Sequence, residues 1–382
     1  MTAPVPNRAR TMSMLPIIQP VFGPEEEQAV AQVLRSGWVT QGPRVAAFEA
    51  ALAPVVGTPH VVAVTSATTG LHLALHAAGI GRGDDVVVPS LSFIASTNAV
   101  WMVGAQPVFA DVDAELPIVT VQSLEQAWTP TTRAVIAVHQ LGVPFDRAAI
   151  AALCKDRGAV LIEDAACAIG TLHHGRPIAQ DAELAVFSFH PRKVLTTGEG
   201  GAIATTSAEL AHRLVGLRQH AMTVSAADRH GQTAREQYPE PAFNYRMTDL
   251  QAAIGVVQVA RLPEILRVRR DLAQTYARLF ADQPDIRPLP VGPQDRWNVQ
   301  TYCVRVPADR RDAVLHELNA LGIGARRGVM AAHLETAWQH LAHGPLPHTQ
   351  AWAAESLALP VFHTMTEADQ VRVASALRSA LG

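Results

Sequence analysis

The sequence has little of what marks several large classes of protein. Only 3 of its 382 residues are cysteines, and Cys154, Cys167 and Cys303 are too scattered to form a disulfide framework or a CxxC metal site. Charged residues make up 17%, and 31 basic side chains nearly balance 34 acidic ones. The absence of a strongly basic run argues against nucleic acid or an anionic membrane surface as the main partner. The odd, scattered cysteines suit a reducing, cytoplasmic compartment.

Long hydrophobic runs are also scarce. The uncharged stretch 86–110 is long enough to suggest a membrane span, but it contains Pro89, Asn98, Gln106 and Pro107. It divides into a strand, a helix and a strand, so we interpret it as a buried α/β segment. Residues 1–14 lack the apolar core of a signal peptide and are expected to form a flexible extension.

The apolar content of 48% is enough for a large core, and the length fits about two domains. Between residues 60 and 220, short apolar runs alternate with helix-like stretches that close on glycine. This order predicts an α/β fold with a mostly parallel central sheet and helices on both faces. Near residue 261 a charged helix and a Pro/Gly-rich break follow. We therefore expect a large domain over 15–258 and a smaller α+β domain over 259–382.

In a parallel sheet, chemistry gathers at the carboxyl ends of the strands. After the first strand, Ser66–Gly70 opens a helix, which suits a bound phosphate or an ordinary N-cap. Phe93 follows the next strand as a core aromatic or as a platform for a heteroaromatic ring. Asp164 leaves a buried apolar strand, so its carboxylate needs an arginine, a metal or a protonated ring nitrogen.

The most informative segment is FSFHPRKVLTTGEGG. It holds Lys193 between a strand and a glycine-rich turn, where a lysine can be desolvated, with a lowered pKa and a nucleophilic amine. A helix N-terminus, an aromatic platform, a carboxylate and a lysine together are the parts that pyridoxal phosphate (PLP) requires. The lysine forms a Schiff base, and the aspartate keeps the pyridine nitrogen protonated so that the ring acts as an electron sink.

With these motifs the sequence resembles the DegT/StrS-type aminotransferases, PLP enzymes of fold type I that aminate keto-sugars, usually nucleotide-linked. The resemblance covers nearly the whole chain. Its motifs are SGWVTQGPRVAAFE, SATTGLHLAL, PSLSFIAS, FADVD, IEDAACAIG, FSFHPRKVLTTGEGG and FNYRMTDLQAAIG.

The resemblance implies a role for each matching residue. Lys193 would carry PLP covalently, and Asp164 would pair with the pyridine nitrogen. The other implied cofactor contacts are Phe93 on the ring, Cys167 beside the ring hydroxyl, and Ala67, Thr68 and Ser188 at the phosphate. Cys167 departs from the family, which usually carries His or Gln there and so a stronger hydrogen-bonding partner.

Asn244 would reach the phosphate of the neighbouring subunit's cofactor, which implies a homodimer with shared active sites. Candidate substrate contacts are Trp38, His190, Arg246 and Arg326. For both arginines a plain salt bridge or a solvated position is the alternative. The 16 histidines form no HExxH pattern, so no metal site is expected.

The function expected from this resemblance is a cytoplasmic aminotransferase. It would move an amino group from L-glutamate or L-glutamine, through pyridoxamine phosphate (PMP), to a keto-sugar in amino-sugar biosynthesis. Three alternatives remain: an aminotransferase for a cyclitol ketone, a PLP/PMP-dependent sugar dehydratase, and a non-catalytic PLP-binding regulator. Lys193 argues against the dehydratases, which carry histidine in its place.

Overall fold

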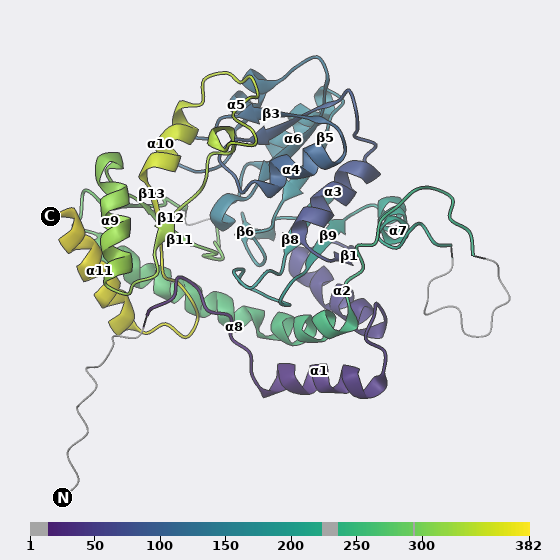
Figure 1. Cartoon of the computed structure of the whole chain (residues 1–382), viewed down its shortest axis with the longest axis horizontal. Helices are drawn as coiled ribbons and strands as arrows, with labels where there is room; N and C mark the ends of the chain where they lie inside the picture. Colours follow the sequence, from purple (N-terminus) through teal and green to yellow (C-terminus); the bar gives the residue numbers. More distant parts are fainter. Residues whose placement is uncertain (1–13, 224–235, 293–294) are drawn as a thin grey trace, which may run out of the picture.

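A computed structural model describes residues 14–223, 236–292 and 295–382. A seven-stranded sheet forms the centre of the larger part, in the order β1-β9-β8-β5-β4-β2-β3 (Figure 1). Its strands are β1 (His60–Val64), β2 (Asp85–Pro89), β3 (Gln106–Ala110), β4 (Thr132–Val138), β5 (Val160–Asp164), β8 (Leu184–Ser188) and β9 (Gly201–Thr205). Strand β9 runs antiparallel to β1 and β8, while the pairs among β8, β5, β4, β2 and β3 are parallel. The predicted mostly parallel sheet is confirmed.

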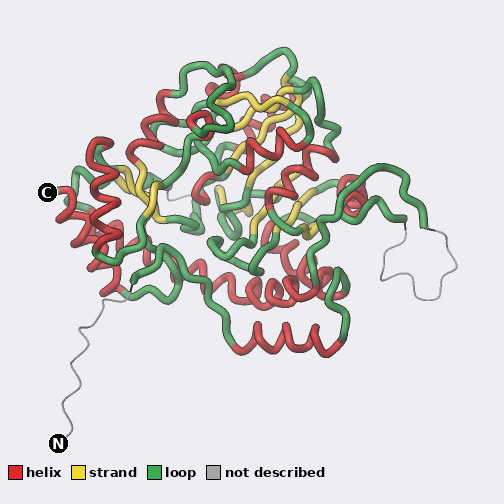
Figure 2. The backbone as a smooth tube through the Cα atoms, viewed as in Figure 1, coloured by secondary structure: helices red, strands yellow, loops and turns green. Residues whose placement is uncertain are grey.

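Helices cover both faces of this sheet (Figure 2). The helices of the larger part are α1 (Pro24–Ser36), α2 (Pro43–Val56), α3 (Ala67–Ala77), α4 (Ala95–Met102), α5 (Val121–Ala127), α6 (Arg147–Asp156) and α7 (Ala208–Leu217), with a 3-10 turn at Gln140–Gly142 and a small hairpin of β6 (Leu172–His173) and β7 (Arg176–Pro177). The uncharged stretch 86–110 is β2, α4 and β3, as the sequence predicts. Among the described residues, no helix is both long enough and apolar enough to span a membrane.

The strands are apolar on both faces, because alternate residues enter different cores. Val62 and Val186 pack with α3, α4 and α7 on one face. Ala63 and Phe187 pack with α2 and α8 on the other, and that face continues over α5 and α6 around Phe145. Period-2 alternation between two buried faces explains the near-continuous apolar runs in the sequence.

The carboxyl-terminal part is an α+β unit with an antiparallel sheet in the order β10-β11-β13-β12. Its elements are β10 (Arg287–Pro288), β11 (Tyr302–Arg305), α9 (Ala308–Ala320), β12 (Arg326–Arg327), a 3-10 turn at Ala332–Leu334, α10 (Pro347–Glu355), β13 (Ser356–Leu359) and α11 (Glu367–Leu381). Its core holds Tyr276, Val304, Leu318 and Leu377.

Helix α8 (Asp249–Phe280) joins the two parts and begins earlier than the sequence suggests. We expected a helix from about residue 261, but Thr248 already caps α8 by accepting a hydrogen bond from the Gln251 N–H. Pro263 lies inside the helix rather than at its start. The expected domain boundary at 258–259 therefore falls within one continuous helix, which contacts α1 and α2 at one end and α11 at the other (Figure 1). Of the expected extension 1–14, residues 1–13 lie outside the described residues.

Candidate functional site

The Asp164 carboxylate ends β5 in a buried position. The Ser96 hydroxyl donates to Oδ2 at 2.9 Å, and the Ala166 N–H donates to Oδ1 at 3.1 Å. Burial raises the pKa of Asp164, and these two hydrogen bonds and the Lys193 charge partly oppose the rise. Among the described residues Asp164 has no ion pair. A buried carboxylate with two donors and no salt bridge suits a protonated ring nitrogen as its missing partner.

Lys193 lies on a tightly held turn after β8. Its N–H donates to the His190 carbonyl at 2.8 Å. The Gln300 side chain clamps both sides of the lysine: Oε1 accepts from the Val194 N–H at 3.0 Å, and Nε2 donates to the Arg192 carbonyl at 2.7 Å. The backbone that carries Lys193 is therefore fixed from two directions.

The amine of Lys193 lies against Cys167, with 3.1 Å between Nζ and Sγ. Cys167 follows β5, and the Asn298 amide donates to its carbonyl at 2.9 Å. Because Asp164 is three residues before Cys167 and responds to the Lys193 charge, the structure brings all three predicted residues together. The thiol thus lies where it can orient the lysine amine.

The N-terminus of α3 presents backbone N–H groups that can donate hydrogen bonds to a phosphate. Ser66 and Thr69 cap each other, with the Ser66 hydroxyl accepting from the Thr69 N–H. The N–H groups of Ala67 and Thr68 make no hydrogen bond among the described residues. Free N–H groups at a helix start attract anions.

Gly201 joins this helix start to Ser188. It pairs with Ser188 across β8 and β9, and a Cβ at Gly201 would lie only 2.5 Å from the Ser66 carbonyl carbon. The absence of a side chain at this position therefore lets β9 lie against the backbone that begins α3. Ser188 is paired with Gly201 on the adjacent strand.

Phe93 lies between β2 and α4 with 66% of its surface exposed. Such exposure excludes the core aromatic that the sequence left open. Its carbonyl accepts from the Ser96 N–H at 3.2 Å, and Ser96 in turn bonds Asp164. The phenyl ring is therefore one turn away from the residue that holds the carboxylate, which suits a stacking platform.

Three of the other predicted residues make no direct contact of this kind with the lysine or the aspartate in the described part of the chain. Among the described residues, no hydrogen bond or ion pair joins Trp38, Asn244 or Arg246 to Lys193 or Asp164. The Trp38 indole donates to the Gln41 carbonyl at 3.1 Å. Asn244 forms an isolated antiparallel β-bridge with Gln219. Arg246 forms another with Val64, on the edge strand β1. Asn244 is exposed.

His190 lies on the same turn as Lys193, whereas Arg326 lies on β12 of the smaller unit. The His190 Nδ1 accepts from the Arg192 N–H at 3.1 Å, and Nε2 lies 3.8 Å from the Glu199 carboxylate. Burial lowers the pKa of His190, which favours the neutral imidazole at pH 7. Arg326 comes from β12 in the smaller unit, where its Nε is buried without a hydrogen bond among the described residues.

Ser96, Asn298 and Gln300 were not singled out from the sequence, and Gly201 was noted only as part of the glycine-rich turn. Ser96 and Gly201 lie inside the PSLSFIAS and GEGG segments, so a closer look at small residues in those motifs could have found them. Asn298 and Gln300 precede β11 in an irregular segment. No local signal marks them, because their role depends on a tertiary contact.

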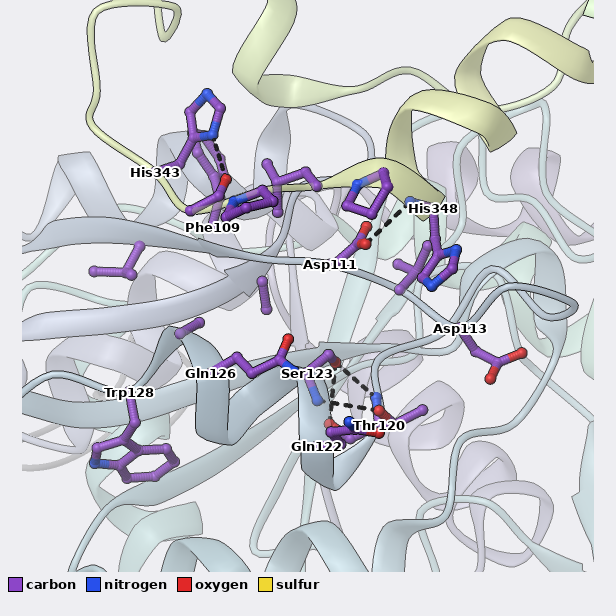
Figure 3. Close-up of a pocket in the computed structure, with 18 of the residues that line it drawn as sticks. Phe109, Asp111, Asp113, Thr120, Gln122, Ser123, Gln126, Trp128, His343 and His348 are labelled. Atoms are coloured by element: carbon purple, nitrogen blue, oxygen red, sulfur yellow. Dashed lines mark hydrogen bonds between the residues drawn. The ribbon is translucent and has the colours of Figure 1, made fainter.

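A separate cavity of about 890 Å³ opens beside β3 and α5, under residues 342–348 (Figure 3). Asp111 lies on its wall and caps α10, accepting from the N–H groups of His348 at 3.0 Å and Thr349 at 2.7 Å. None of the predicted site residues lines this cavity. Within the described ranges, no three His, Cys, Asp or Glu side chains gather as a metal site.

Comparisons with known proteins agree with this geometry. Residues 20–378 match the model of the DegT/DnrJ/EryC1/StrS aminotransferase family. The aminotransferase TlmJ from Streptoalloteichus hindustanus is 34% identical, with a TM-score of 0.90 over 96% of this chain and 99% of that chain.

Two further structures are informative. The putative sugar aminotransferase Spr1654 from Streptococcus pneumoniae, in its PLP form, is 27% identical with a TM-score of 0.90, over 96% of this chain and 98% of that chain. DesI in the presence of its TDP-sugar product is 30% identical with a TM-score of 0.88, over 97% of this chain and 93% of that chain.

Proposed function

The chain belongs to the DegT/DnrJ/EryC1/StrS aminotransferase family, and from that premise we propose that it moves an amino group from L-glutamate or L-glutamine to a nucleotide-linked keto-sugar. The family and the similar structures make it a PLP-dependent aminotransferase of fold type I. The TDP-sugar bound by DesI supports a nucleotide-linked acceptor. The scattered, unpaired cysteines support a cytoplasmic location.

The observation that carries the proposal is the convergence of Lys193, Asp164 and the start of α3 on one edge of the sheet. The residues fit the cofactor: Asp164 is a buried acid without an ion pair among the described residues, and Gly201 leaves room for the start of α3, where the Ala67 and Thr68 N–H groups make no hydrogen bond within that part of the chain. Phe93 is an exposed aromatic between β2 and α4. When bound, PLP supplies the electron sink that stabilises negative charge at the donor Cα.

Each of the predicted residues would then have a separate role in the reaction. Asp164 would hold the ring nitrogen protonated, and Ser188 with the N–H groups of Ala67 and Thr68 would bind the phosphate. The Lys193 amine would accept the proton from the donor Cα as general base and give it up again as general acid. Cys167, in contact with Nζ at 3.1 Å, orients that amine. The donor and then the acceptor react in turn, so ping-pong kinetics are expected.

We also propose that the enzyme is a homodimer with shared active sites. Asn244 and Trp38 make no hydrogen bond to Lys193 among the described residues, and the Asn244 side chain is exposed without a hydrogen bond there, as expected for a side chain that reaches into a partner's site. Trp101 and Met102, at the end of α4, are further exposed apolar side chains. Sedimentation of the purified protein should give twice the 40.9 kDa chain mass. A monomer that retains full activity would contradict this arrangement.

An absorption spectrum tests the function. Purified protein with PLP should show the band of a lysine-bound cofactor, and L-glutamate should convert it to the PMP form. A band that ignores L-glutamate but responds to L-glutamine would identify the donor and direct attention to cyclitol ketones as acceptors. A bound cofactor that no amine converts would favour the regulator alternative, and no band at all would contradict the roles of Lys193 and Asp164.

A further inference from the structure

Residues 297–300, the strap, form a short irregular segment that crosses the carboxyl ends of three parallel strands. The strap leads into β11 of the smaller unit, yet its side chains bond to the larger part. The Trp297 indole donates to the Leu141 carbonyl at 2.8 Å, in the turn after β4. Asn298 bonds to the segment after β5, and Gln300 bonds to the turn after β8. Because β8, β5 and β4 are neighbours in the sheet, the strap connects three adjacent loops.

The Asn298 amide is fully hydrogen-bonded inside the strap and has no exposed surface. Its Nδ2 donates to the carbonyls of Cys167 at 2.9 Å and Ile169 at 3.0 Å. Its Oδ1 accepts from the Gln300 N–H at 2.9 Å. Both donors and the acceptor of the amide are thus in use. Asn298 therefore links the segment that carries Cys167 to the residue that clamps the Lys193 turn.

The loop after β4 leaves room for this contact. Gly142 has a φ of +89°, a conformation that favours glycine. A Cβ at this position would lie 2.1 Å from Asn298 Oδ1 and 2.9 Å from the Cys167 carbonyl oxygen. A side chain on residue 142 would therefore push the strap away from the segment after β5.

The backbone of the strap is strained and is anchored from α8. Val299 has a φ of +53°, in the left-handed region that β-branched residues rarely adopt. The buried Arg269 donates from Nε to the Val299 carbonyl at 3.0 Å and from Nη2 to the Gln300 carbonyl at 2.9 Å. Strain of this kind persists only where the surrounding structure imposes it, and it is frequent at functional sites. The anchored, strained backbone holds Gln300 against the Lys193 turn.

We infer that Asn298 and Gln300 are positioning residues for the Lys193 amine. The strap sets where this amine lies relative to Asp164 and Cys167, which come from a different strand end. The inference rests on the proposed aminotransferase function and adds the residues that place its lysine. A lysine side chain is long and flexible, so its amine is placed accurately only if its backbone is fixed. A shift of about 1 Å at a reacting group can cost about 100-fold in rate.

The first test compares Gln300→Ala with Gln370→Ala in the PLP-loaded protein. Gln370 is a similarly buried glutamine, but its Nε2 donates to the Leu272 carbonyl at 2.7 Å, between α11 and α8. The amino donor is whichever of L-glutamate and L-glutamine converts the parent faster. Gln300→Ala should lower the maximal conversion rate by about 10- to 100-fold and change the half-saturating donor concentration by less than about threefold. Both variants should melt below the parent, but Gln370→Ala should keep the parent's rate.

Formation of the lysine-bound cofactor provides a readout that does not depend on turnover. The cofactor-free proteins are titrated with PLP, and borohydride reduction traps the fraction that is attached to Lys193. Gln300→Ala should raise the PLP concentration for half-maximal attachment by about 10-fold, because two hydrogen bonds that hold the turn are lost. Gln370→Ala should match the parent.

Gln300→Glu separates the two contacts of the clamp. The change is nearly isosteric and keeps an oxygen that accepts from the Val194 N–H. Only the protonated carboxyl can donate to the Arg192 carbonyl. The rate of Gln300→Glu relative to the parent should therefore fall as pH rises, whereas the relative rate of Gln300→Ala should stay constant. This variant also serves if the alanine variant does not fold.

A double variant tests whether the two side chains act together. Asn298→Ala removes the bonds to the segment after β5 and the acceptor for the Gln300 N–H. It should lower the maximal rate as Gln300→Ala does. The double variant should lose less than the product of the two separate losses, because both changes release the same strap.

Different failures identify different errors. A Gln300→Ala protein with the parent's rate and cofactor attachment would overturn the positioning role. Equal losses of rate in Gln300→Ala and Gln370→Ala would show that the strap only stabilises the fold, and fully multiplicative losses in the double variant would show that it is not one unit. Either result would also overturn the inference. If the parent attaches no PLP, or if no amine converts it, the proposed function itself fails.

Discussion

Replacing Lys193 with alanine should lower the rate of amino transfer by about 10⁴-fold or more, because one side chain supplies both the covalent attachment and the proton transfer. No neighbouring amine can substitute, since the only other lysine in the sequence is Lys155. Steady-state assays with L-glutamate and a keto-sugar, together with the cofactor absorption band, measure the loss.

Lys155→Ala is the matched control. Lys155 lies exposed near the end of α6, so its removal should change neither the band nor the rate. Borohydride reduction of the PLP-loaded protein should attach the cofactor to the peptide that contains Lys193. A Lys193→Ala protein that turns over within tenfold of the parent would exclude the mechanism.

Replacing Asp164 with asparagine should lower turnover by about 100-fold or more and weaken PLP binding, because a charge-assisted hydrogen bond to the ring nitrogen is replaced by a neutral one. The change is nearly isosteric. Ser96 and Ala166 can still bond the amide, so the pocket should keep its shape. Spectroscopic titration of the cofactor-free protein measures the affinity, and donor kinetics measure the turnover.

The stability of the cofactor-free protein separates this role from a structural one. Burial raises the pKa of Asp164 above its unfolded value, so the folded state binds more protons and loses stability as pH rises between the two values. Asp164→Asn removes that penalty. At pH 7 the cofactor-free variant should therefore melt no lower than the parent, and the difference should shrink as pH falls.

Asp111→Asn is the contrasting control. Asp111 is also buried, but it caps α10 through two backbone N–H groups. Its replacement should lower the melting temperature and leave PLP affinity unchanged. A cofactor-free Asp164→Asn protein that loses stability as Asp111→Asn does, with unaltered PLP affinity, would show that Asp164 is structural.

The division of the chain into a larger part and a smaller unit could be predicted only in part from the sequence. The charged segment that follows Arg261 suggested a helix starting near that residue, whereas α8 begins at Asp249 and has Pro263 in its interior. A proline is tolerated inside this long helix because packing against α1 and α2 compensates for the hydrogen bond that it lacks. Helix propensity is a local property, so it does not include the stabilisation that this packing provides.

The sequence by itself determined the α/β class, the mostly parallel sheet and the strand-end positions of Asp164 and Lys193. These follow from apolar periodicity and motif spacing, which are local properties. Only the tertiary structure decided that Phe93 is exposed, that Gln300 clamps the Lys193 turn, and that the Lys193 amine contacts Cys167. Each depends on which distant segments meet. The physical reason is that burial and pairing of a side chain are set by its neighbours in space, and the printed order of residues does not contain them.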